Sequence, residues 1–162
     1  MTFAQCCLLV QVASTWAMTG LIWFVQIVHY PLFDRVGVAG FARYERDHSQ
    51  LTTLVVGPLM LAEAFTAMWL VARPPAGVPP LWTIRGAVLL GVVWAATCFL
   101  SVPQHRALAG GFDARAYQRL VSTAWVRTVA WSLRGLLVLA MLWRILSAHS
   151  LQSLQSKGSP VP

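Results

Sequence analysis

The chain has 162 residues, of which 57% are hydrophobic and only 10% are charged, and its formal net charge is +7. A soluble core of this size could not bury so much apolar surface, so the composition argues against a soluble globular domain. The basic residues are scattered and form no run beside exposed aromatic residues, which argues against nucleic-acid binding and favours contact with lipid headgroups. We therefore expect a multi-pass protein of the plasma or inner cell membrane, with the lipid bilayer as its first partner.

Four apolar segments are close to the length of about 20 residues that a hydrocarbon core requires. They run roughly from Phe3 to Val28, from Leu51 to Val71, from Trp82 to Val102 and from Ala124 to Leu146. The first lacks a basic start and a cleavage site, so we expect it to be a permanent helix. The sequence thus predicts an all-α integral membrane four-helix bundle as a single domain over residues 1–148. A disordered polar tail is expected over residues 149–162.

The long connections predict an internal repeat. Each begins just after a proline, Pro31 or Pro103, and continues into an arginine-containing amphipathic turn, at residues 41–46 and 113–119. Two tandem helical hairpins would place both amphipathic turns on one membrane face. The alternative to a repeat is that these two short stretches resemble each other by chance. The proline-rich segment from Arg73 to Pro80 would then join the hairpins as an extended connector.

Charged residues inside the spans indicate a polar bundle axis, because a charge facing lipid is costly. Aligning the hairpins places Glu63 and Arg134 within about one helical turn of each other in depth. The sequence predicts an ion pair between them, with either a structural or a proton-handling role. Arg127 lies nearer the histidines, where it could orient a substrate together with Trp131.

The histidines give the main signal for chemistry. His29, His48 and His105 lie where spans meet one polar boundary, and Glu45 precedes His48 by one helical turn. Imidazole and carboxylate groups bind iron, copper or zinc, and histidine also ligates haem. The alternative is that they are interfacial histidines bonded to loop carbonyls, without a cofactor.

The candidate site residues fall into three groups. The candidate metal ligands are His29, Glu45, His48 and His105. The candidate cofactor-binding residues are His29, His48, His105 and Trp131. The candidate catalytic residues are Glu63, Arg127 and Arg134. His149 lies in the predicted tail and belongs to no group.

Several short segments carry a resemblance. They are WFVQIVHYPLF at residues 23–33, Tyr44 to His48, Gly57-Pro58, and Trp125 to Thr128 with Trp131 and Arg134. The chain resembles small four-helix bacterial membrane proteins of unknown function and, more distantly, the anthrone oxygenase-like membrane family. That resemblance implies oxidation of a lipophilic, polycyclic or quinol-like substrate within the bundle.

Three functions stay open at this point. The first is an oxygenase-like oxidoreductase that acts on a lipophilic small molecule. The second is a non-catalytic subunit that docks another membrane protein or a second copy of the chain. The third is a small proton-coupled transporter in which Glu63 takes up and releases the proton.

Overall fold

The computed structural model describes residues 2–158, with side chains up to Ala148. Every element in this part of the chain is helical. The elements are α1 (Phe3–Phe24), the π-helical η1 (Val25–His29), the 3-10 helix η2 (Tyr30–Arg35), α2 (Val38–Ala72), α3 (Pro80–Ala96), the π-helical η3 (Thr97–Ser101), α4 (Val102–Leu108) and α5 (Ala114–Gly158).

These elements form four long rods, each apolar enough and long enough to cross a membrane. The rods cover residues 3–35, 38–72, 80–108 and 114–148, which confirms the predicted all-α bundle and its four spans. Large apolar side chains lie on their outer faces. Leu51, Phe65 and Leu136 expose 65%, 64% and 62% of their surface, as expected of positions that contact lipid.

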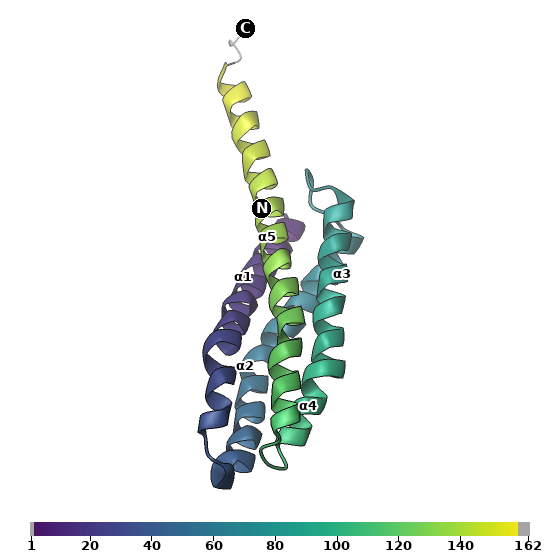
Figure 1. Cartoon of the computed structure of the whole chain (residues 1–162). Coiled ribbons are helices and arrows are strands. Elements are labelled where there is room, and N and C mark those ends of the chain that lie inside the picture. Colours follow the sequence, from purple (N-terminus) through teal and green to yellow (C-terminus); the bar gives the residue numbers. More distant parts are fainter. Residues whose placement is uncertain (1, 159–162) are drawn as a thin grey trace.

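Both long connections lie at one end of the bundle. The turn after η2 and the turn between α4 and α5 meet there, and the N-terminal start of α1 and the connector after α2 lie at the other end (Figure 1). We call the end with the two long connections the histidine end, because His29, His48 and His105 all lie towards it. This arrangement agrees with two hairpins that run in the same direction.

A further feature is shared by the two hairpins. The first rod of each contains a five-residue π-helical segment, η1 or η3, followed closely by Pro31 or Pro103. The ring of a proline crowds the carbonyl four residues earlier, which here lies inside the π-helical segment, so a wider turn relieves that contact. The prolines and the π-helical segments are separated by the same number of residues, which supports the predicted repeat.

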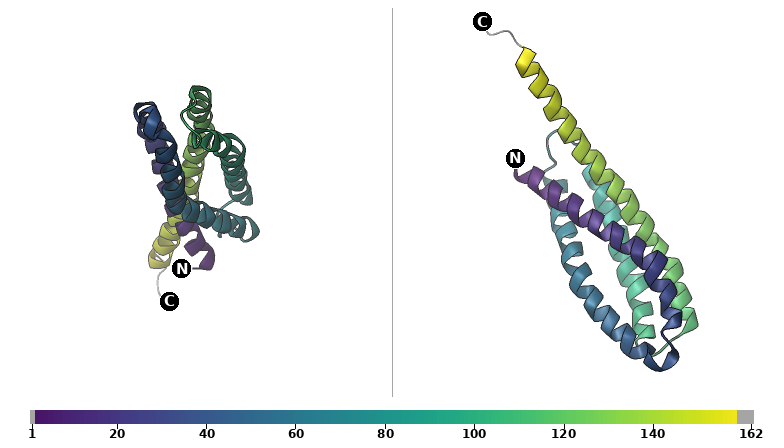
Figure 2. Two further views of the ribbon diagram at one scale, coloured as in Figure 1. Left: turned by 90° about the horizontal axis from the view of Figure 1, so that it is seen from below. Right: turned by 90° about the vertical axis from the view of Figure 1, so that its left-hand side faces the viewer.

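The helices are longer than the spans predicted from hydrophobicity. The amphipathic turn at residues 41–46 belongs to α2, which begins at Val38, and α5 continues to Gly158 through residues predicted to be a disordered tail. Residues 149–157 contain neither proline nor glycine, so the helix propagates outward from the span. Figure 2 shows α5 extending past the other helices. Residues 159–162 of the predicted tail lie outside the described residues.

Candidate functional site

The three histidines come together at the histidine end of the bundle, as predicted. The Nε2 atom of His29 lies 2.9 Å from Nδ1 of His48, and the ring centroids of His48 and His105 are 5.6 Å apart. The turn formed by η1 and η2 positions His29, whereas α2 and α4 carry His48 and His105. The predicted proximity of these side chains is therefore confirmed.

His105 is held by a buried carboxylate. Its Nδ1 atom lies 2.6 Å from Oε1 of Glu45, whose side chain is fully buried, and the hydroxyl of Ser49 donates to the same oxygen at 3.1 Å. A carboxylate only accepts hydrogen bonds, so Nδ1 of His105 carries the hydrogen and Nε2 is left as the basic nitrogen. This is the arrangement in which a carboxylate orients a histidine for proton transfer.

A buried tyrosine and arginine continue this network. Nε2 of His105 lies 3.4 Å from the Tyr30 hydroxyl oxygen, and Nη2 of Arg127 donates to that same oxygen at 3.0 Å. Tyr30 is 2% exposed and Arg127 is 9% exposed. Arg127 thus lies beside the histidines, as predicted. Tyr30 was not predicted, although its position between His29 and Pro31, on the turn that leaves the span, was available as a signal.

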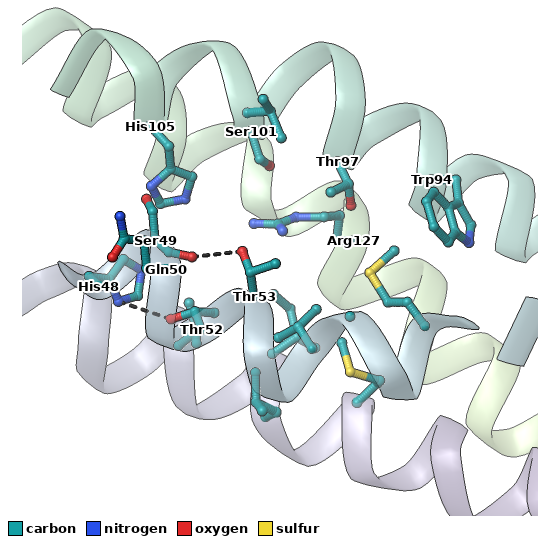
Figure 3. A pocket seen from close by; sticks show the side chains of 18 of the residues that line it. His48, Ser49, Gln50, Thr52, Thr53, Trp94, Thr97, Ser101, His105 and Arg127 are labelled. Atoms are coloured by element: carbon teal, nitrogen blue, oxygen red, sulfur yellow. Dashed lines mark hydrogen bonds between the residues drawn. The ribbon is translucent and has the colours of Figure 1, made fainter. Parts of the chain in front are cut away.

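A cavity of about 660 Å³ opens beside this network. Most of its wall is apolar, with Met18, Ile22 and Met60 among the lining residues. The polar residues lie between α2 and the rod formed by α3, η3 and α4, where His48, His105, Ser101 and Arg127 converge (Figure 3). The lining also includes Leu61, which is 49% exposed on the outer face of α2, so the cavity reaches the lipid-facing surface.

The charged pair predicted in the middle of the bundle is present. Nε of Arg134 lies 3.2 Å from Oε1 of Glu63, and both side chains are at most 1% exposed. Glu63 also accepts hydrogen bonds from the Thr15 hydroxyl at 2.7 Å and from Nε1 of Trp131 at 3.0 Å. Arg134 additionally donates to the Gly86 carbonyl. The predicted ion pair is confirmed.

Trp131 lies between the cavity and the Glu63–Arg134 ion pair. Its ring lines the cavity, while its N–H group is bonded to Glu63. It therefore forms the cavity wall nearest the ion pair, on the same α5 helix that carries Arg127 and Arg134.

The predicted metal site receives no support from the side-chain arrangement. Among the described residues, no group of three or more histidine, cysteine, aspartate or glutamate side chains could hold a metal ion. His29 and His48 face each other, and His105 faces Glu45. A bound iron, copper or zinc ion, or a haem, stays a prediction for His29, Glu45, His48 and His105. The side chain of His149 lies outside the described residues.

Comparison with protein-family models, with curated proteins and with solved structures gives no match for this chain. The resemblance to the anthrone oxygenase-like family therefore stays a prediction.

Proposed function

We propose that the protein is a membrane oxidoreductase that binds a lipophilic molecule in the cavity and takes a proton from its polar end. The observation that supports this proposal is the position of His105. It lies between the buried Glu45 carboxylate and the Tyr30 hydroxyl, at the polar side of an otherwise apolar cavity.

The burial of Glu45 favours a chemical role over a packing role. Removing a carboxylate from water costs several kcal/mol, and the hydrogen bonds from His105 and Ser49, both to Oε1, offset this only in part. Oε2 of Glu45 has no hydrogen-bond partner among the described residues, so its environment is not optimised for stability. A carboxylate bonded to one nitrogen of a histidine fixes the orientation and tautomer of the ring, which is what a general base needs.

His48 and His29 offer a route for the proton. His48 lines the cavity, and its Nδ1 atom lies 2.9 Å from Nε2 of His29 and 3.2 Å from the Thr52 hydroxyl. His29 is only partly buried and lies where α1 and η1 give way to the connecting turn. An imidazole can accept a proton at one ring nitrogen and release one from the other, so this bonded pair would pass a proton from the cavity wall to the membrane face.

The size and lining of the cavity favour a compact apolar substrate. Pockets for small molecules span roughly 300–1,000 Å³, and their walls are mostly apolar with a few convergent polar groups. The resemblance described above implies a lipophilic, polycyclic or quinol-like substrate, and for a quinol the oxidation begins with loss of a hydroxyl proton. Dissolved oxygen would accept the two electrons and two protons of the quinol and leave as hydrogen peroxide.

The test is a comparison of Glu45→Gln with Ser49→Ala. Both variants remove a partner from the same network, but only Glu45→Gln removes the charge that supports His105. We expect Glu45→Gln to slow oxidation of decylhydroquinone roughly 100-fold or more, the usual contribution of a general base. Ser49→Ala should leave the rate within a few-fold of the wild type. The measurement is quinone formation by absorbance, with protein purified in a neutral detergent.

The proposal fails if the wild-type protein does not accelerate this oxidation, or if Glu45→Gln is as active as Ser49→Ala. Circular dichroism of both variants would establish that the helical bundle is retained.

A further inference from the structure

Two buried polar groups on the cavity wall have no partner. Nε of Arg127 and the Oγ atom of Ser101 make no hydrogen bond among the described residues, although Ser101 is only 2% exposed and Arg127 only 9%. Leaving a buried donor unpaired costs about 1–3 kcal/mol, and more where the donor is charged. Both residues line the cavity, and they lie near each other in it (Figure 3).

The charges around the cavity have one sign. Arg46, Arg106 and Arg127 line it, and no aspartate or glutamate belongs to the described lining. The buried carboxylates are already engaged, Glu45 with His105 and Glu63 with Arg134. Among the described side chains, Arg127 forms no ion pair. Because the dielectric constant inside the bundle is low, an arginine without an ion-pair partner favours an anionic group beside it.

Tyr30 shows how the site holds a single oxygen atom. Its hydroxyl oxygen receives a hydrogen bond from Arg127 at 3.0 Å and lies 3.4 Å from His105. A cation and a basic histidine can thus approach one oxygen from different directions. The Nε–H group of Arg127 and the Ser101 hydroxyl are the donors left for a second oxygen.

We infer that Arg127 and Ser101 form an oxyanion-binding subsite, so the cavity takes amphiphilic anions. Such a ligand has an apolar body and ends in a carboxylate or a phenolate oxygen. Ser101 is the last residue of the π-helical segment η3, and π-helical turns often occur at functional sites. This inference rests on the proposed function in one respect, namely that the cavity is a binding site.

The experiment compares charged probes with neutral probes of the same shape. The carboxylate arm pairs dodecanoate with dodecanol, and the phenolate arm pairs pentachlorophenol with pentachloroanisole. Binding to the purified protein in a neutral detergent is measured by isothermal titration calorimetry. We expect the wild-type protein to bind at least one of the two anions roughly tenfold or more tightly than its neutral partner. The arm that shows the preference identifies the ligand class.

Three variants test whether the preference for anionic probes comes from Arg127 and Ser101. Arg127→Gln should abolish it while keeping the affinity for the neutral probe. Ser101→Ala, a small change that does not threaten folding, should reduce it several-fold. Arg106→Gln is the matched control, because it removes an exposed arginine from the same cavity wall and should keep most of the preference.

Equal binding of charged and neutral probes by the wild-type protein would overturn the inference and leave the proposed function standing. A preference that is unchanged in Ser101→Ala and lost in Arg106→Gln would also overturn it, since the exposed arginine would then be responsible. If no probe binds, the cavity is not a binding site, and both proposals fail.

Discussion

At the level of single residues, the energetics centre on Glu63. Its carboxylate accepts hydrogen bonds from three side chains, of which Arg134 carries the compensating charge. Two buried charges are tolerated because each neutralises the other, whereas either one alone would be exposed to a low dielectric. Loss of either partner should therefore destabilise the fold, although the ion pair as a whole contributes little net stability.

We expect Glu63→Gln to lower the free energy of unfolding by about 3–5 kcal/mol, because it leaves Arg134 charged and buried without a counter-ion. Thr15→Val, which removes one hydrogen bond to the same carboxylate and one from Gln11 but keeps the ion pair, should cost about 2 kcal/mol. Thermal unfolding in detergent, followed by circular dichroism, measures both. Equal destabilisation by the two substitutions would show that the charge of Arg134 is compensated elsewhere.

At the level of elements, small residues determine how closely the helices approach. A Cβ atom at Gly135 on α5 would lie 3.4 Å from the Thr19 hydroxyl and from the Trp16 ring on α1. Small residues at such positions are typical of membrane helices, whose association depends on close packing of the backbones. The same helix α5 positions Arg127, Trp131 and Arg134, so its contact with α1 also fixes the site.

We expect Gly135→Val to destabilise the bundle by about 1–3 kcal/mol, since the added methyl groups must displace Trp16 or separate the two helices. Gly91→Val is the matched control, because a Cβ atom at Gly91 on α3 would meet no atom within 4 Å. Unfolding temperatures of the two variants in the same detergent compare these effects. A Gly135→Val protein as stable as Gly91→Val would mean that the contact between α1 and α5 is loose.

At the level of the whole molecule, the cavity lies between the two hairpins. Its lining comes from α1, η1, η2 and α2 of the first hairpin and from α3, η3, α4 and α5 of the second. Neither hairpin alone would enclose it. Gly57 on α2 lines this space, and a Cβ atom there would meet nothing within 4 Å.

Substitutions at Gly57 should therefore close the cavity in proportion to side-chain size. We expect Gly57→Ala to have little effect and Gly57→Leu to weaken binding of dodecanol about tenfold, the usual consequence of an overpacked contact. Gly20→Leu adds the same side chain to α1, where a Cβ atom also meets nothing within 4 Å and Gly20 is not among the cavity residues. Isothermal titration of the three proteins compares their affinities. Equal affinities for Gly57→Leu and Gly20→Leu would place the ligand elsewhere.

The sequence by itself determined the fold class, the number of spans and the depth at which the charges lie. The length of each apolar segment and the position of each charge within it are properties of that segment alone. They can therefore be recognised in the sequence without knowing how the helices pack. For the same reason the pairing of Glu63 with Arg134 and the proximity of the three histidines were predictable. Hydrophobicity did not indicate the ends of the helices, because a helix propagates beyond the membrane wherever proline and glycine are absent.

The tertiary structure alone decided which atoms face each other. Which side chains meet depends on the rotation of each helix about its axis. This rotation determines that His105 bonds to Glu45 and that Arg127 donates to Tyr30. It also leaves polar groups of Arg127 and Ser101 without a partner. The π-helical segments η1 and η3 shift that rotation near the histidine end, which a regular helical periodicity does not anticipate. The cavity, finally, is a property of the space left between two hairpins, and no single segment of the sequence encodes it.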